Sequence, residues 1–586
     1  MADPQQVLAQ RVHDAIVASF GPEYGDADPL IRPSSFADFQ ANVALPLGKR
    51  LGRAPRQVAA ELTSRLDVTD MCAAPEVSGP GFINFTLRDD WIAGQASQML
   101  NDPRLGLAPV ERPQTVVVEY SSPNVAKEMH VGHLRTTIVG DAIARVLEFA
   151  GHRVIRDNHV GDWGTPFGML IEHLLDVGAD SAEAALLMTD PNAFYQAARH
   201  KFDTEPAFTE RARSRLVRLQ AGDPDTLAIW QRLVDISREY LHKVYARLDV
   251  TLTDDDIRGE SFYNDLLADT VSVLEEKGIA TESDGALCAF PAGFTGREGR
   301  PLPLIIRKSD GGYNYATTDL AAVRYRVDKL SCDRSVYVVG SEQALHFQMV
   351  FAVAREAGWI PESASFEHAQ IGMVLGQDGN RLRTREGETP KLSGLLAEGV
   401  DRARGILDEL DAAARFEEAE LDAVAEAVGI GAVKYADLST ARESAYLFDW
   451  DRMISFRGNT GPYLQYATAR IRSIFRRAAD AGTGDAEAAA RSAGVAITAG
   501  PERALALRLL SFGAMVTQLG ETAEPHRLCA YLFDVASLFT TFYEECPVLK
   551  AESESLRVSR LALCALTLAV LTKGLGLLGV PVPERM

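Results

Sequence analysis

The segment from 114 to 160 constrains the fold more than any other part of the sequence. TVVVEYSS at 115–122 is a short β-branched run, typical of a buried parallel strand. The apolar residues at 134–150 then lie on one face of a helix, which Gly151 is suited to end. HRVIRDNHV at 152–160 has the pattern of a second strand. Strand, helix and strand in succession predict a βαβ unit with parallel strands.

The same alternation returns later in the chain. SVYVVG at 335–340 predicts a strand, 343–357 a helix, and FEHAQIGMV at 366–374 another strand. A mostly helical insertion is expected over about 176–260. We therefore predict a Rossmann-like, doubly wound α/β domain with a parallel sheet over 111–455.

Two further units flank this domain. Residues 1–110 predict a small α/β unit that ends in the proline-containing linker LGLAPVERPQ. After about residue 455 strand patterns vanish, and apolar residues such as Leu528, Leu532 and Val535 recur at helical intervals. We expect an all-α bundle over 456–586.

The composition is that of a soluble globular protein with several cores. The 586 residues are 46% hydrophobic and 24% charged, which excludes a small binding module and a disordered chain. With 60 Lys and Arg against 81 Asp and Glu, the formal net charge is -21. Such an acidic sum argues, on its face, against a nucleic-acid partner.

Cysteine usage and hydropathy predict a cytoplasmic protein without a membrane segment. The six cysteines are scattered with no CxxC pair, so we expect no structural zinc and no disulfide scaffold. The N-terminus shows no signal peptide. The apolar run 561–572 lies between Arg560 and Lys573, and twelve residues are too few to cross a bilayer.

The residues richest in chemistry are His130-Val131-Gly132-His133, between the first strand and the first helix of the βαβ unit. A helix N-terminus at the carboxyl end of a strand binds phosphates, because unpaired N–H groups and the helix dipole point there. Gly132 would let a base or sugar approach the backbone, and the histidines could donate to phosphate oxygens. An HxxH tetrapeptide alone is more often two ordinary histidines; its position here favours the functional interpretation.

These residues resemble the HIGH signature of class I aminoacyl-tRNA synthetases, and SSPNVAKEMHVGHLRTT resembles arginyl-tRNA synthetases. The similarity continues through blocks in family order along most of the chain. They are NHVGDWGTPFG, YNYATTDLAAVRYR, VVGSEQALHF, IGMVLGQDGNRLRTREG, SFRGNTGPYLQYATARI and PHRLCAYLFDVASLFTTFYEECPVL. The resemblance implies a class I catalytic domain over 111–455, an N-terminal accessory tRNA-binding domain and a C-terminal anticodon-binding bundle.

The implied reaction is arginine–tRNA ligation in two steps. L-arginine and ATP would give arginyl-adenylate, and the arginyl group would then pass to the 3′ end of tRNA(Arg). Because a charged pocket rejects uncharged competitors strongly, we expect no editing site. We also expect a monomer.

The resemblance implies an arginine site made by Glu119, Asp319 and the Tyr315 hydroxyl, with Asn124 and Gln343 at the backbone end of the substrate. This agrees with chemistry, since a guanidinium is a planar fork that pairs with carboxylates. A single Asp or Glu more often caps a helix or forms an ion pair, so the prediction depends on the whole set.

For ATP, the resemblance implies contacts from two histidines, a glycine and the segment after residue 372: His130, Gly132, His133, Met373, Val374 and Thr384. Mg²⁺ would accompany the ATP. The second class I signature, KMSKS, is degenerate here, because 380–385 reads NRLRTR without a lysine. The predicted catalytic set is His130, His133, Lys127, Arg383 and Arg385. Lys127 could supply the missing ammonium, or it could be a solvated turn lysine; the residues leave both open.

The predicted tRNA contacts lie in both outer domains. Residues 442–477 contain seven arginines and three acidic residues, and 49–56 contains a run of lysine and arginine residues. These two segments suggest basic tracks on an otherwise acidic protein. In the bundle the predicted contacts are Tyr463, Gln465 and Arg470, whereas Tyr466 is interpreted as helix core. In the N-terminal unit they are Phe39, Gln40 and Asn42, at a domain that would meet the tRNA elbow, although FADFQAN could equally be a packing motif.

Two alternative functions compete with this interpretation. A cysteinyl enzyme would need zinc ligands near the amino-acid site, and the sequence has no such cluster. A catalytically decayed, synthetase-like tRNA-binding protein would not need the histidines and carboxylates that this sequence retains.

Overall fold

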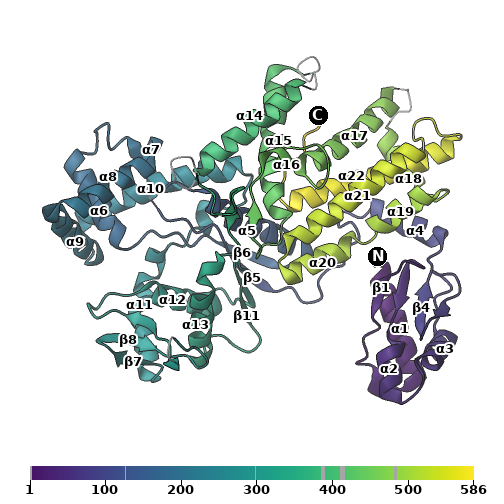
Figure 1. Ribbon diagram of the computed structural model, residues 1–586, viewed down its shortest axis with the longest axis horizontal. Helices are drawn as coiled ribbons and strands as arrows, with labels where there is room; N and C mark the ends of the chain where they lie inside the picture. The colour runs from purple at the N-terminus through teal and green to yellow at the C-terminus, as the bar shows by residue number, and fades with distance from the viewer. Residues whose placement is uncertain (1–2, 126, 297–298, 384–389, 410–415, 481–484) are drawn as a thin grey trace.

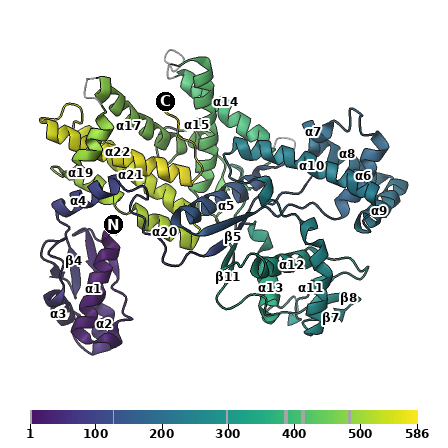
Figure 2. The same ribbon diagram turned by 180° about the vertical axis from the view of Figure 1, so that it is seen from behind.

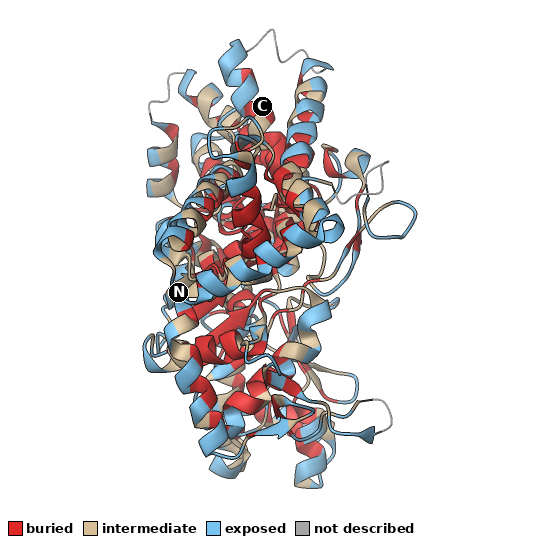
Figure 3. Cartoon of the chain, turned by 90° about the vertical axis from the view of Figure 1, so that its left-hand side faces the viewer, coloured by how far each residue is buried: buried red, intermediate tan, exposed pale blue. Residues whose placement is uncertain are grey.

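In the computed structural model, residues 3–125, 127–296, 299–383, 390–409, 416–480 and 485–586 are described. The N-terminal domain and the helical insertion lie at opposite ends of the molecule, with a parallel sheet between them (Figures 1 and 2). The C-terminal helices pack beside the sheet on the side of the N-terminal domain. Buried residues run continuously through this centre, and the outer helix faces are exposed (Figure 3).

The central sheet has four parallel strands in the order β11-β10-β5-β6. Their bounds are β5 (Thr115–Glu119), β6 (Arg153–Asp157), β10 (Arg334–Tyr337) and β11 (Ser365–His368). The chain moves outward from β5 to β6 on one side and then continues with β10 and β11 on the other, so strand order reverses between β5 and β10. This confirms the predicted doubly wound sheet, in which ligands bind at the carboxyl ends beside such a reversal.

Helices cover both faces of the sheet. Alternate side chains of β10 face opposite ways, so Val336 joins a core shared with α5 (Val131–Ala150) and the C-terminal bundle. Tyr337 joins a second core with Phe347 and Phe351 of α13 (Ala344–Glu356), which also contains residues of α12 (Tyr315–Asp328). Burial on both faces explains the continuous β-branched run of β5.

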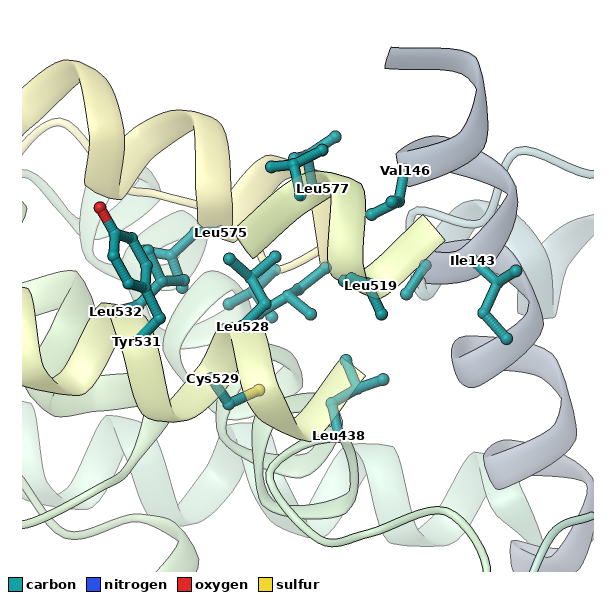
Figure 4. Packing of buried hydrophobic residues seen from close by; sticks show 14 of the residues in the cluster. Ile143, Val146, Leu438, Leu519, Leu528, Cys529, Tyr531, Leu532, Leu575 and Leu577 are labelled. Carbon is teal, nitrogen blue, oxygen red and sulfur yellow. The ribbon is translucent and has the colours of Figure 1, made fainter. Parts of the chain in front are cut away.

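The helix α5 is itself enclosed. Its inner side packs on β5 and β6, and its outer side meets the bundle, where Ile143 and Val146 approach Leu519 and Leu577 (Figure 4). The helix is therefore apolar or small around most of its circumference.

Further elements of the central region extend the sheet and its insertion. Within the predicted helical insertion lie α7 (Leu186–Thr189), α8 (Pro191–Thr204), α9 (Pro206–Gln220) and α10 (Pro224–Arg247), whereas α6 (Thr165–Val177) lies almost wholly before its expected start. After it come η2 (Asp254–Asp256), η3 (Glu260–Tyr263) and α11 (Asn264–Glu276), and η5 (Ser341–Gln343) precedes α13. Beyond β11 lie β12 (Val374–Leu375), α14 (Leu392–Glu409), α15 (Glu418–Leu438), β13 (Tyr446–Leu447) and α16 (Trp450–Met453).

A three-stranded antiparallel sheet is the main element that sequence patterns did not predict. It comprises β7 (Ala280–Ser283), β8 (Ala286–Ala289) and β9 (Leu304–Arg307). The turn at Asp284-Gly285 has positive φ at both residues, 51° and 78°, as a two-residue hairpin requires. The Asp-Gly pair was the available signal.

The N-terminal domain is a four-stranded antiparallel sheet with helices, in the strand order β1-β2-β4-β3. It comprises α1 (Pro4–Phe20), η1 (Pro22–Tyr24), β1 (Ile31–Pro33), β2 (Phe39–Ala41), α2 (Ala44–Leu51), α3 (Pro55–Arg65), β3 (Glu76–Ser78) and β4 (Phe82–Phe85). The following helix α4 (Asp89–Leu100) packs on α19 and α22 of the bundle. Arg503 of α19 reaches back to both Asp38 carboxylate oxygens, at 2.8 and 2.7 Å, and so links the bundle to the N-terminal domain.

The C-terminal region is all helical in its described residues, as predicted. Its helices are α17 (Gly461–Asp480), α18 (Ala486–Ala493), α19 (Gly500–Leu509), α20 (Phe512–Thr522), α21 (Pro525–Glu545) and α22 (Glu554–Leu577). By length and composition α22 could cross a membrane, because the helix extends beyond the twelve-residue apolar run. Most of its apolar stretch is buried inside the protein, which is the arrangement of a core helix.

The close contact of α5 with the sheet generates a stability prediction. A Cβ on Gly140 would overlap the Tyr120 side chain, so Gly140→Ala should push α5 off the sheet and lower the free energy of unfolding by about 2–3 kcal/mol. Gly94→Ala is the matched control, since that exposed position in α4 has nothing within 4 Å of the added Cβ and should be neutral or slightly stabilising. Urea unfolding followed by circular dichroism would compare the two. Equal effects of the two changes would contradict this packing.

Candidate functional site

A cleft of about 430 Å³ opens at the carboxyl ends of β5 and β10, at the point where strand order reverses. Ten of the predicted site residues line it. They are Glu119, Asn124, His130, Gly132, His133, Tyr315, Asp319, Gln343, Met373 and Val374. Lys127 and Arg383 do not line it, and Thr384 and Arg385 lie outside the described residues.

The two histidines form a reciprocal cap at the start of α5. His130 Nδ1 accepts from the Gly132 N–H at 3.0 Å, and His133 Nδ1 accepts from the His130 N–H at 3.1 Å. A neutral imidazole has one donor and one acceptor nitrogen, so in both rings the proton is on Nε2. Gly132 is required for this arrangement, because a Cβ there would lie 2.8 Å from His130 Cε1.

Both histidines are held neutral. Burial lowers the pKa of His133 to about 3, with further contributions from His130 and Lys127. Burial also lowers the pKa of His130, and the nearby Arg381 and Lys127 charges add to the effect. The ring centroids are 3.9 Å apart, and two imidazolium charges at that distance would repel. The pair can therefore present two Nε2–H donors without adding net charge.

The lining of the cleft also contains acidic residues. Glu119, at the end of β5, is 5% exposed and accepts from Arg326 Nη2 at 2.5 Å. Asp319 on α12 pairs with His346 Nε2 at 2.6 Å. Tyr315, the first residue of α12, is 61% exposed, and its ring centroid is 4.8 Å from that of His346. These groups suit a cationic, planar ligand group.

Glu260 is a third acidic residue that lines the cleft, and sequence patterns did not identify it. Burial raises its pKa to about 7, whereas His159 opposes the rise and Asp162 and Asp319 add to it. It lies in η3, far from the signature motifs in sequence. No local pattern marks it, because only the folding of the insertion brings it to the sheet edge.

Asn124 and Gln343 flank the reversal point on exposed backbone. Asn124 forms a parallel bridge with Gly161, and a Cβ on Gly161 would overlap the Asn124 Oδ1. The glycine of NHVGDWG is thus explained by the close approach of the asparagine side chain.

The degenerate loop contributes Arg381 to the cleft. Arg381 bridges Leu375 in backbone pairing and is exposed, and it was missed because the tract was assigned to its later arginines. Arg383 lines a separate neighbouring hollow with Arg381. The Lys127 ammonium lies 4.4 Å from the ring centroid of Tyr195 on α8, near enough to both histidines to affect their pKa values.

The N-terminal residues predicted to contact tRNA are mainly packed. Phe39 is 9% exposed and belongs to the core, so the packing interpretation of FADFQAN is correct for it. Gln40 donates to Asn84 Oδ1 at 2.8 Å, and the Asn42 N–H donates to the Leu30 carbonyl. Phe36 is instead the exposed aromatic residue of this segment, at 88%.

Predictions in α17 also need correction. Gln465 is fully buried and donates to the Ala427 and Pro581 carbonyls at 2.9 and 2.7 Å, so it packs the C-terminal tail and does not face an RNA. The interpretation of Tyr466 as helix core is wrong, because its side chain is 46% exposed. Tyr463 is half-buried against Phe533, and the Arg470 guanidinium lies 4.2 Å from the Tyr543 ring centroid.

Several arginines of the two basic tracks are occupied within the protein. Arg50 pairs with Asp26 and Arg53 with Glu61, at 2.9 and 2.7 Å. Arg472 donates to the Pro583 carbonyl and pairs with Glu584. The local positive charge is therefore weaker than a residue count suggests.

Within the described ranges, no group of three or more His, Cys, Asp or Glu side chains could hold a metal ion. All six cysteines are free and buried.

Known proteins are similar to this chain along its whole length. Family models match for "tRNA synthetases class I (R), catalytic domain" at 95–450, "DALR anticodon binding domain" at 464–586 and "Arginyl tRNA synthetase N terminal domain" at 5–87. The chain is 60% identical over 586 residues to the arginine–tRNA ligase of Thermobifida fusca and 50% identical over 594 residues to that of Synechococcus elongatus. Each of these alignments covers 100% of both proteins.

Solved structures agree. The arginyl-tRNA synthetase from Plasmodium falciparum is similar with a TM-score of 0.85 and 30% identity, and that of Thermus thermophilus with 0.79 and 25%. Both comparisons cover 100% of each chain.

The low pKa of His133 predicts an acid-sensitive fold. The unfolded chain binds a proton near its ordinary pKa of about 6.5, whereas the folded ring resists protonation down to about pH 3. Stability should therefore fall as the pH decreases, by about 2 kcal/mol between pH 7 and pH 5 from this residue. His133→Asn keeps an acceptor for the His130 N–H and should remove that part of the slope in urea unfolding. An unchanged slope in the variant would contradict a neutral, cap-forming His133.

Proposed function

The chain belongs to the arginyl-tRNA synthetase family, and we propose that the two ends of its cleft divide the binding of arginine and ATP. The protein is an arginine–tRNA ligase, a class I enzyme that activates L-arginine with ATP and charges tRNA with it. The observation that carries the proposed site is the cleft itself, which joins an acidic end to a neutral histidine cap at the strand-order reversal.

The acidic end is proposed to hold the substrate guanidinium. Glu119 and Asp319, with the Tyr315 hydroxyl, would accept its N–H donors, and Glu260, whose pKa burial raises to about 7, also lines the cleft. Asn124 and Gln343 would hold the α-amino group and orient the carboxylate. A neutral competitor would leave buried carboxylates unpaired, which gives strong discrimination without editing.

The histidine end is proposed to hold ATP. His130 and His133 would donate from Nε2 to phosphate oxygens as charge develops, with Gly132, Met373, Val374 and Thr384 contacting the nucleotide. One oxygen of the arginine carboxylate bonds to the α-phosphorus as the bond to pyrophosphate breaks. In the second step the terminal 2′-hydroxyl oxygen attacks the arginyl carbonyl carbon, AMP leaves with the bonding electrons, and the hydroxyl proton is released.

Cations on the cleft rim are proposed to neutralise the phosphates. Arg381 faces the cleft, and Lys127, Arg383 and Arg385 are the further candidates. Mg²⁺ would arrive on the ATP phosphates, because the histidine end offers no carboxylate cluster in the described residues. Its chemistry would be charge neutralisation at the triphosphate.

The outer domains are proposed to bind tRNA(Arg): residues 1–110 at the elbow and 456–586 at the anticodon, around a catalytic domain at 111–455. Gln40, Asn42, Tyr463 and Arg470 remain proposed contacts. We further propose a monomer that acts in the cytoplasm and does not bind membranes.

ATP–pyrophosphate exchange with each amino acid, measured with and without tRNA, tests the activity. We expect arginine to be the one amino acid that supports exchange, and we expect that exchange to require tRNA. A protein that binds tRNA and supports no exchange would favour the decayed alternative.

Removing either predicted carboxylate should weaken arginine binding selectively. We expect Glu119→Gln and Asp319→Asn each to raise the KM for arginine roughly hundredfold, because each leaves a guanidinium donor unpaired in a buried site. The KM for ATP should change little. Asp328→Asn, at the exposed far end of the same α12 helix, is the control and should behave as wild type. Parallel losses in both KM values would contradict the division of the cleft.

The Lys127 hypothesis has its own test. If Lys127 substitutes for the absent KMSKS lysine, Lys127→Ala should lose adenylate formation, whereas Arg383→Ala and Arg385→Ala lose less. Pyrophosphate-exchange rates for the three variants decide this. Undiminished exchange by Lys127→Ala would contradict this hypothesis.

A further inference from the structure

A buried arginine of the protein lies directly behind the proposed arginine site. Arg326 on α12 is fully buried, and its Nη2 donates to Glu119 Oε2 at 2.5 Å and to Asp157 Oδ2 at 3.0 Å. Asp157 ends β6 and pairs in register with Glu119, so the two carboxylates are adjacent across the sheet. Of the three side chains, only Glu119 lines the cleft.

The charges of this trio do not cancel. One guanidinium serves two carboxylates through a single nitrogen, so the buried trio has a formal net charge of -1 when both carboxylates are ionised. A buried charge is costly unless a counter-charge approaches it. Of the three side chains, only the Glu119 carboxylate has access to the cleft, so a cationic ligand bound there can supply positive charge to the trio.

We propose that Arg326 is a positioning residue for the substrate: it holds the Glu119 carboxylate charged and aimed into the cleft, so that substrate arginine completes a balanced set of two guanidinium groups and two carboxylates. This inference rests on the proposed function, since it assumes that Glu119 contacts the substrate. It adds a role for Arg326 and Asp157, which do not reach the cleft themselves.

The surroundings of Glu119 support a charge-setting role for Arg326. Burial raises the pKa of Glu119, and the Arg326 charge opposes that rise more than any other neighbour. His159 opposes it less, and Asp157 adds to it. The other titratable groups around the trio and the cleft include Tyr263 and Glu260 of η3, Tyr337 of β10, Asp319 of α12, Glu342 of η5 and His346 of α13. Tyr337 also stacks under Arg326, whose Cζ is 4.6 Å from the ring centroid, and so fixes the guanidinium plane.

The test is the pH dependence of the arginine KM in pyrophosphate exchange by the full-length enzyme with tRNA present. Each variant is compared with wild type at the same pH, because Glu260, with a pKa of about 7, can make the wild-type value pH-dependent as well. In Arg326→Gln, Glu119 should bind a proton at neutral pH. We expect the KM for arginine of Arg326→Gln to exceed that of wild type at least tenfold at about pH 6.5. As the pH rises and Glu119 ionises, this excess should decrease by at most about tenfold per pH unit.

Three further arms separate charge setting from structural support. Asp157→Asn leaves Arg326 and Glu119 as a neutral pair, so its KM for arginine should rise by a factor that does not recover at high pH. Arg326→Lys keeps the charge and should raise the KM without a new pH dependence, which also serves if Arg326→Gln does not fold. L-citrulline, the neutral ureido isostere of arginine, should inhibit Arg326→Gln as well as it inhibits wild type.

The matched control is Arg334→Gln, at the opposite end of β10, where Arg334 pairs with Glu367 at 2.6 Å. It should leave both KM values unchanged. Three results would overturn the inference. The first is an excess KM of Arg326→Gln that is constant with pH, and the second is an equal loss in ATP or citrulline binding. The third is an unchanged or lower KM for arginine in Asp157→Asn. If Glu119→Gln itself leaves the arginine KM unchanged, the proposed arginine site fails; if Glu119→Gln raises it while Arg326→Gln shows no pH dependence, only this inference fails.

Discussion

The burial of α5 on two sides is the constraint on which the rest of the structure depends. One side of this helix packs on β5 and β6, and the other side packs on α15, α20, α21 and α22. Its first turn carries His130 and His133, and its glycine at 140 lets it approach Tyr120 of the sheet. A helix held between two cores cannot shift without disturbing both. The packing of both cores against α5 therefore fixes the position of the histidine cap.

The charge distribution follows a related logic. A net charge of -21 suggests a protein that repels nucleic acid, yet part of the negative charge lies in the cleft, which Glu119, Asp319 and Glu260 line. At the phosphate end the protein avoids excess positive charge, because burial keeps both histidines neutral and Arg381 lies on the exposed loop. The lining of one cleft thus combines acidic side chains with two neutral histidines, which is the charge distribution that the proposed division between arginine and ATP requires.

Most of the cleft was predictable because its residues lie in long motifs at strand ends, where parallel topology must bring them together. The failures have specific physical causes. Gln465 and Phe39 lie within recognisable motifs, but a motif does not show whether a residue faces solvent or core, and both are buried. For Tyr466 the prediction failed in the opposite direction: aromatic residues on a helix suggest a core face, but this side chain is exposed. Glu260 and Arg381 reach the cleft from segments whose position depends on the fold of the insertion and of a loop. Local sequence patterns do not indicate that these segments lie near the cleft.

The strands of the parallel sheet, the helices between them and the C-terminal helices are properties that this amino-acid sequence specifies locally, through periodicity and β-branched runs, and the turn at His130-Val131-Gly132-His133 marks the cleft. The protonation of the histidines and the exposure of each aromatic residue depend on burial, which only the folded chain sets. The pairing of Arg326 with Glu119 and Asp157 joins positions 207 and 169 residues apart in the sequence. Such contacts set the electric field and the access of water at each group. Both depend on every surrounding element, and so only the complete tertiary structure decides them.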